Sequence, residues 1–304
     1  MATLRGQNFR VMTYDSETHS YLVIASSTNC VITLTNNTQD TSTKDDVGMA
    51  EMPEITTKAA QVQVDSLSVS DAATLLAAIK NKTLFSLLWC ETDNSDNQTA
   101  VAGDIARIVS AYLTDITFNF NNREYAAKNV TFTCLDDMQS LEDIPDSDRV
   151  SIQPRTEGQF IRLFLSQRTA GQQQLPSTVI AAARQLSLHV SVGLEDVSTK
   201  DTPGKFLNQE PVSISWDIST TALVRGNDII TSAVTAKDFS SLQDIYNDDA
   251  KVNVQIANVS GDNQRTKGTV ILTGTCQIQS LTLNAPNRQV ATWTAQLQGY
   301  GIYT

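Results

Sequence analysis

Apolar and polar residues alternate along most of this chain, which is the pattern of half-buried β-strands. The clearest runs are 28–35, where Cys30, Ile32 and Leu34 are the apolar positions, and 186–192. Further strands are predicted at 9–14, 21–25, 59–67, 84–90, 100–110, 112–120, 126–135, 160–165, 212–218, 251–257, 266–273, 276–283 and 290–298. We therefore expect a mainly β protein.

Two segments have helical spacing instead. The first is 71–80, with Ser70 as the expected N-cap and one apolar face made by Ala72, Leu75, Leu76 and Ile79. The second is a shorter helix near 238–247, with inward positions Phe239, Leu242 and Ile245 or Tyr246. One amphipathic helix among many strands normally packs its apolar face on its own sheet, so we expect both helices to flank sheets.

The order of these segments occurs twice. Ser-Thr-Lys-Asp stands at 42–45 and again at 198–201, an offset of 156 (199 − 43), inside long polar loops predicted at 36–58 and 193–211. Further on, Asn122-Arg123 matches Asn287-Arg288 at an offset of 165 (288 − 123). The interpretation is an internal duplication, with a first module at 1–135, an acidic linker at 136–157 and a second module at 158–304.

The fraction of charged residues is low, and the net charge is unevenly distributed along the chain. Charged residues make up 18% of the chain, below the ~25% usual for globular domains, and Ser, Thr, Asn and Gln fill the gap. The net charge of −11 lies in residues 1–152, which hold 21 acidic and 10 basic side chains, whereas residues 153–304 hold 12 of each. With no basic stripe, tight binding of nucleic acid is disfavoured.

No catalytic or metal-binding arrangement is found. The four cysteines and two histidines lie far apart, which favours buried free thiols over a zinc site. The acidic cluster at 136–148 lacks the spacing of a calcium loop. His189 alternates with apolar residues, so it should point away from its strand's apolar face and be a surface or interface residue. We expect neither an enzyme nor a cofactor.

Neither a membrane-spanning run nor a signal segment is seen, so we expect the chain to be made in a cytoplasm. A duplicated module also suits ring assembly, because closed homo-oligomers are built from repeated surfaces. A ring of six single modules would need three such chains.

Taken in order, these features resemble the tail tube (major tail) proteins of tailed bacteriophages. The resemblance rests on a short first strand and on the Ser-Thr-Lys-Asp loops with a following glycine. It also rests on the strand Trp216-Asp-Ile218-Ser and the ending Gly299-Tyr-Gly301. The chain departs from most members in having two modules. Some siphophage tubes fuse two and stack as trimeric, pseudo-hexameric rings.

The resemblance implies two β-sandwich or half-barrel modules, each with one flanking helix, whose strands join into a continuous inner barrel around passing double-stranded DNA. It implies that the long loops contact a neighbouring module or the next ring. The expected contact residues are Thr43, Lys44, Asp45, Gly48, Thr199, Lys200, Asp201 and Gly204. Implied partners are further copies of the chain, a tape measure protein and a tail terminator protein, with no membrane. The implied location is the virion tail, assembled in the bacterial host cytoplasm.

Two alternatives stay open. One is a related ring, from a baseplate or from the tube of a contractile injection system. The other is a different class, a tandem β-sandwich binding or adhesin module, which the absence of a signal segment and of an aromatic platform for a sugar disfavours.

Overall fold

The structure is a computed structural model that describes residues 6–15, 20–24, 27–42, 53–92, 100–101, 106–140, 156–167, 178–180, 183–201, 204–224, 239–260 and 266–304. It is mainly β, as the alternating pattern predicts, with two α-helices and two 3-10 turns among the described residues. The strands of the first half are β1 (Phe9–Asp15), β2 (Ser20–Val23), β3 (Ser27–Asp40), β4 (Pro53–Ser66), β5 (Leu84–Thr92), β6 (Ala100–Val101), β7 (Arg107–Asn121), β8 (Ala127–Cys134) and β9 (Gln139–Ser140). Those of the second half are β10 (Ile161–Gln167), β11 (Thr178–Val179), β12 (Ala183–Asp196), β13 (Gln209–Leu223), β14 (Val252–Ser260), β15 (Thr266–Asn284) and β16 (Thr292–Gly299). The helices are α1 (Ala72–Lys80) and α2 (Phe239–Asn247), and the 3-10 turns are η1 (Gly6–Asn8) and η2 (Gly158–Phe160).

Strand pairing in the two halves follows one scheme. In the first half β2, β1, β5, β7, β8, β4 and β3 pair in that order, and in the second half β11, β10, β14, β15, β16, β13 and β12 do the same, all antiparallel. The bounds of β3 map onto those of β12 at an offset of 156 (183 − 27). Those of β8 map onto β16 at 165 (292 − 127).

Local backbone features repeat at the same offsets. Arg123 and Arg288, which are 165 residues apart (288 − 123), both have positive φ, in the turns that precede β8 and β16. β7 has a bulge between Leu113 and Asp115, and β15 has one between Ile278 and Ser280, again at an offset of 165 (278 − 113). The correspondence between the halves therefore extends to single residues.

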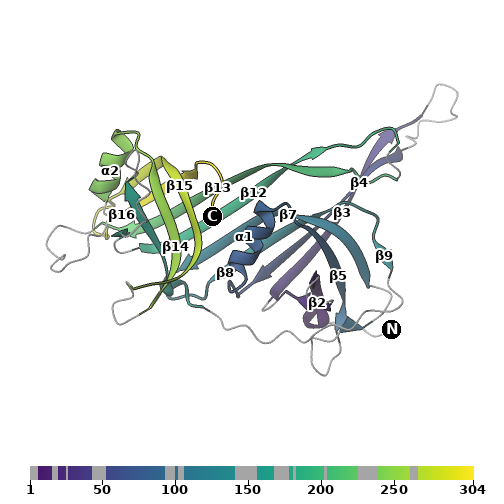
Figure 1. Ribbon diagram of the computed structural model, residues 1–304, viewed down its shortest axis with the longest axis horizontal. Coiled ribbons are helices and arrows are strands. Elements are labelled where there is room, and N and C mark those ends of the chain that lie inside the picture. Colours follow the sequence, from purple (N-terminus) through teal and green to yellow (C-terminus); the bar gives the residue numbers. More distant parts are fainter. Residues whose placement is uncertain are drawn as a thin grey trace.

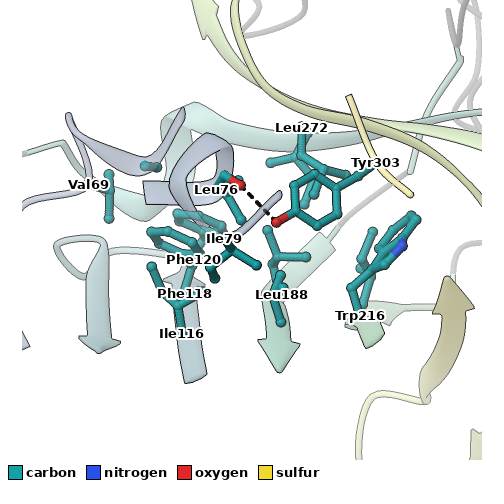
Figure 2. Packing of buried hydrophobic residues seen from close by; sticks show 14 of the residues in the cluster. Val69, Leu76, Ile79, Ile116, Phe118, Phe120, Leu188, Trp216, Leu272 and Tyr303 are labelled. Atoms are coloured by element: carbon teal, nitrogen blue, oxygen red, sulfur yellow. Dashed lines mark hydrogen bonds between the residues drawn. The ribbon is translucent and has the colours of Figure 1, made fainter. Parts of the chain in front are cut away.

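One hydrophobic core crosses both halves. Its buried residues come from β1, β4, β5, β7 and β8 of the first half, from β10 and β12 to β16 of the second, and from both helices. Figure 2 shows Leu76 and Ile79 of α1 facing Phe118, Phe120 and Leu188, with Tyr303 reaching in from the C-terminal segment. The helix faces pack on the sheet as expected, with Ala72, Leu76 and Ile79 of α1 and Leu242 and Ile245 of α2 buried.

Trp216 occupies a slot made by glycines. Its indole Nε1 donates a hydrogen bond to the carbonyl of Gly301 at 2.8 Å. A Cβ added at Gly299 or Gly274 would lie 2.3 or 2.4 Å from its ring, closer than real side chains approach. Trp216 and the Gly299-Tyr-Gly301 ending, named separately in the sequence, thus form one packed unit that fixes the end of β16 against β13.

Two hairpins project from the body. The outer ends of strands β3 and β4 lie beside the outer ends of β12 and β13 at one end of the molecule (Figure 1). The amide of Lys58 donates to the carbonyl of Lys205 at 2.8 Å, and Nζ of Lys205 donates to the carbonyl of Ile55 at 2.5 Å. These contacts tie the two long hairpins to each other along one edge.

Several predicted boundaries were wrong. The expected loops at 36–58 and 193–211 are shorter than predicted and begin and end in paired strand, because β3 continues to Asp40 and β4 starts at Pro53, and β12 continues to Asp196 and β13 starts at Gln209. Side chains on both faces of a projecting hairpin are exposed, so no apolar alternation marks it. The predicted strand 100–110 is divided, since Ala100–Val101 form β6 whereas residues from Arg107 onward continue into 112–120 as one strand, β7; the segments 266–273 and 276–283 likewise belong to one strand, β15. The N-cap of α1 is Asp71 without a side-chain cap hydrogen bond, and Ser70 contacts the hydroxyl of Ser68 instead.

Candidate assembly surface

The two halves are joined by backbone pairing between β7 and β12, which we call the module seam. It consists of residues 115–121 of β7 and 185–191 of β12, in antiparallel register with Phe118 opposite Leu188. The first part of β7, Arg107–Tyr112, pairs on the same edge with β5. The bulge between Leu113 and Asp115 lies between the part of β7 that pairs with β5 and the part that pairs with β12. One long strand therefore pairs with strands of both halves.

The strands equivalent to those of the module seam each leave an edge without a partner among the described residues. β3 corresponds to β12 and pairs only with β4, and the segment Ser280–Asn284 of β15 pairs only with β16. We call residues 29–35 of β3 and 280–284 of β15 the open edges. They are the two ends of the run of paired strands β3–β4–β8–β7–β12–β13–β16–β15, so one chain carries one of each.

Burial differs sharply between the seam and the open edges. Phe118 and Val190 in the module seam have no exposed surface, whereas the corresponding residues Leu283 and Leu34 are 48% and 64% exposed. Apolar side chains on a bare strand edge favour pairing with another chain. The open edges are therefore built like the seam but lack the strand that covers it.

The module seam also carries a cluster of charged groups on its polar face. Nε2 of His189 lies 2.7 Å from an Asp115 carboxylate oxygen, and Nδ1 lies 3.0 Å from one of Asp217. Partial burial lowers the pKa of His189, but hydrogen bonds and the charges of Asp115 and Asp217 outweigh it and raise that pKa above its ordinary value. As predicted, His189 points away from the apolar face; its two carboxylate partners were missed, because they lie 74 and 28 residues away in sequence.

The polar face that holds His189 continues across eight strands. Its positions are Asn29, Thr33 and Thr35 of β3, Gln61, Gln63 and Asp65 of β4, Asn129, Thr131 and Thr133 of β8, Asp115, Thr117 and Asn119 of β7, Ser187, His189 and Ser191 of β12, Ser215, Asp217, Ser219 and Thr221 of β13, Thr294, Gln296 and Gln298 of β16, and Ser280, Thr282 and Asn284 of β15, with Val31 as an apolar exception. None of these positions is Lys or Arg. Cross-strand hydrogen bonds stiffen the face, for example Ser191 with Ser215 at 2.7 Å.

The predicted loop residues fall partly outside the described structure. Thr43, Lys44, Asp45 and Gly48 lie outside the described residues. Thr199, Lys200 and Asp201 are exposed at the end of the β12–β13 hairpin, and Gly204 has φ +86°, a left-handed conformation that suits glycine.

Both hairpin loops begin with the same turn. The amide of Ser42 donates to the carboxylate of Asp40 at 3.0 Å, and the amide of Ser198 donates to that of Asp196 at 2.9 Å, 156 residues later (198 − 42). Hydrogen bonds from Ser198 lower the pKa of Asp196. This local Asx turn gives the repeated Ser a structural role at the base of each loop.

The described residues offer no other chemistry. Among them no three His, Cys, Asp or Glu side chains gather in a way that could hold a metal ion. No disulfide joins the four cysteines, all of which lie in the described part of the chain: Cys90, Cys134 and Cys276 are buried and Cys30 is half-buried, and burial raises the pKa of Cys134 to about 12. No helix in the described part of the chain is both long and apolar enough to cross a bilayer.

Comparison with known proteins gives structural neighbours only. No protein-family model matches the sequence, and no curated protein matches it. The SPP1 tail tube, solved by solid-state NMR and cryo-EM, is 16% identical with a TM-score of 0.36 and covers 48% of this chain and 77% of its own. The tail of an empty gene transfer agent particle, refined with C6 symmetry, is 16% identical with a TM-score of 0.34, covering 47% and 93%. The virion of a native gene transfer agent particle is 14% identical with a TM-score of 0.34, covering 49% and 97%.

Proposed function

We propose that this chain is a structural virion protein whose copies join edge to edge into rings that stack as a phage tail tube. The observation that carries the proposal is the pair of open edges, because each corresponds to a strand that is already joined inside the chain. The chain is then two tail-tube modules in tandem, and the module seam is the template for the contact between chains.

The residue correspondence gives the register of that contact. Transferring the module seam by −156 on β12 and +165 on β7 places Ile32 of one chain opposite Leu283 of another, as Leu188 lies opposite Phe118. It likewise places Leu34 opposite Leu281. Both exposed leucines, Leu34 and Leu283, would then be covered, and a bare sheet edge would be removed at each end of the chain.

The contact is head-to-tail, since β15 of one copy meets β3 of the next. Such heterologous contacts close into rings when the rotation between neighbours permits. With two modules per chain, three chains give a pseudo-hexameric ring, which is the arrangement implied by the resemblance to fused siphophage tubes. The sheet then becomes a continuous barrel without edges.

The polar face would line the lumen, because its opposite face holds the core and α1. A wall of Ser, Thr, Asn and Gln with a few Asp side chains presents no Lys or Arg to DNA phosphates, and His189 on that wall lies between the carboxylates of Asp115 and Asp217. Duplex DNA could therefore pass without being gripped, as ejection requires. The role is non-enzymatic, and tape measure and tail terminator proteins would meet the stacked rings at their ends.

The long hairpins would make the contacts along the tube axis. They project at one edge of the module. Thr199, Lys200 and Asp201 are exposed at the end of the β12–β13 hairpin, and Thr43, Lys44 and Asp45 match them in sequence and lie outside the described residues. We infer that these tips, with Gly48 and Gly204 at their turns, reach the next ring or a neighbouring module.

Electron microscopy of the purified protein tests the proposal. Wild type should form rings or tubes, and Leu283→Lys should abolish them while the monomer stays folded by circular dichroism. Ile302→Lys is the matched control, because Ile302 is also an exposed apolar residue and its counterpart Asp137 is already charged. Stable wild-type monomers with affinity for glycans would overturn the tube and favour the adhesin alternative.

A further inference from the structure

We propose that Asp115, His189 and Asp217 form a selector that makes β12 accept β7 of its own chain in preference to β15 of another copy. This inference rests on the proposed function, because a selector matters only where both kinds of strand edge are present. It concerns which strand edges pair with each other. The two halves have the same fold, so the fold alone does not decide whether β12 pairs with β7 or with β15 of another copy.

The selector lies across three strands at the module seam. His189 of β12 sits between Asp115 of β7 and Asp217 of β13, and each ring nitrogen has one carboxylate partner. These two carboxylates are the charged groups that contact it from the strands on either side. A protonated imidazole therefore links the two halves through Asp115, while Asp217 holds its ring in place.

The open edges lack this chemistry. The offsets of 156 and 165 give Thr33 as the counterpart of His189 (189 − 156), Gln61 as that of Asp217 (217 − 156) and Ser280 as that of Asp115 (115 + 165). All three are neutral. The backbone and apolar positions of the two contacts match, so charge is the feature that separates them.

A wrong pairing would separate the ions. If β15 of another copy paired with β12, Thr282 would lie opposite His189 and Ser280 would take the diagonal place of Asp115, so His189 would lose its contact across the seam. Asp115 on the displaced β7 would lie opposite Thr35 of a β3 edge, with Thr33 in the place of His189 and no cation beside it. Specificity follows when a mismatched partner leaves charges unpaired, even where its apolar contacts are acceptable.

A second contact also distinguishes the module seam inside the chain from the proposed contact between chains. Tyr303 donates its hydroxyl hydrogen bond to the carbonyl of Leu76 in α1, across the two halves, at 2.9 Å. Its counterpart in the first half is Met138 (303 − 165), whose thioether cannot donate a hydrogen bond. The contact inside the chain thus carries two polar links, His189 with Asp115 and Tyr303 with Leu76, for which the open edges have no equivalents.

Disulfide reporters in the full chain test the selector, in a Cys30→Ser background. Val31→Cys with Asn284→Cys reports the correct contact between chains, because these positions correspond to Ser187 and Asn119, which lie opposite each other in the module seam. Ser187→Cys with Asn284→Cys reports the wrong contact. Each is oxidised during assembly, and cross-linked chains are counted on non-reducing gels, with the selector intact or replaced by Asp115→Ser, His189→Thr and Asp217→Gln.

With the selector intact, the correct reporter should cross-link and the wrong one should scarcely do so. Replacement should raise the ratio of wrong to correct cross-links by about 1.4- to 5-fold, the range spanned by the one cross-strand pair of opposite charge that the wrong pairing breaks. Asp115→Asn, which keeps side-chain size and removes only the charge, should shift the ratio in the same direction even if the triple variant folds poorly. An unchanged ratio in Asp115→Asn overturns the selector, whereas absence of the correct cross-link would instead overturn the proposed function.

Discussion

Tyr303, the penultimate residue, donates its hydroxyl hydrogen bond to the backbone carbonyl of Leu76, 227 residues earlier in the chain. The phenol also packs edge-on against Trp216, and burial raises its pKa, so the hydroxyl stays protonated as a donor. The C-terminal segment of the second half is thereby fastened to the helix of the first, as Figure 2 shows.

Tyr303→Phe should lower the free energy of unfolding by about 0.5–1.5 kcal/mol, the usual contribution of one hydrogen bond. Urea titration of the full chain measures it. Tyr246→Phe, at an exposed tyrosine of α2, is the control and should change little. Equal effects of the two substitutions would contradict the role given to the Tyr303 hydroxyl.

Gly299→Ala should destabilise the protein by about 1–3 kcal/mol, because its Cβ would overlap the Trp216 ring and the packed core must shift. Adding Trp216→Phe should recover part of that loss relative to Trp216→Phe alone, since the smaller ring leaves room. Gly6→Ala meets nothing within 4 Å and serves as control. Thermal and urea unfolding report the differences, and additive effects of the two substitutions would argue against direct packing.

His189 should make stability depend on pH in one direction. Its pKa is raised in the folded protein, so its contribution is fully present below the unfolded pKa of ~6.5 and is lost as pH rises through the folded pKa. The difference in unfolding free energy between wild type and His189→Thr should therefore shrink as the pH rises above that point. A difference that stays constant from acid to alkaline pH would mean that His189 contributes only by packing.

The hairpin tips should matter for stacking and not for folding. Lys200→Ala with Asp201→Ala removes two exposed side chains, so the unfolding free energy should stay within about 0.5 kcal/mol of wild type. Tube length in electron micrographs should fall, and Lys44→Ala with Asp45→Ala should act likewise. Tubes of normal length in both double variants would contradict the proposal that the hairpin tips contact the next ring.

Much of this fold could be predicted, because alternation identifies strands wherever one face is buried. The runs around Ile32 and Leu188 and the face of α1 are such cases. Alternation fails at the projecting hairpins, where both faces are exposed, and in β7 and β15, where a bulge shifts the pattern inside one strand.

The candidate surface was predicted less well. The repeated Ser-Thr-Lys-Asp loops drew attention to the hairpin tips, whereas the open edges are visible only from the pairing of β7 with β12. A strand edge has no sequence signal of its own, since each residue looks the same whether or not a neighbour pairs with it. Likewise, no sequence pattern singles out Asp115 and Asp217, and their role is visible only from their contacts with His189 in the structure.

The most direct test of the account is a disulfide between the open edges. Cα atoms of directly opposite residues in an antiparallel pair lie about 4.5–5.5 Å apart, within the range that a disulfide spans. Oxidised Val31→Cys/Asn284→Cys in the Cys30→Ser background should run on non-reducing gels as covalent dimers and closed trimers. The matched pair Asn119→Cys/Ser187→Cys should close within one chain and remain monomeric in size. Monomers alone from the first variant, while the second forms its internal disulfide, would contradict the claim that the module seam is repeated between chains.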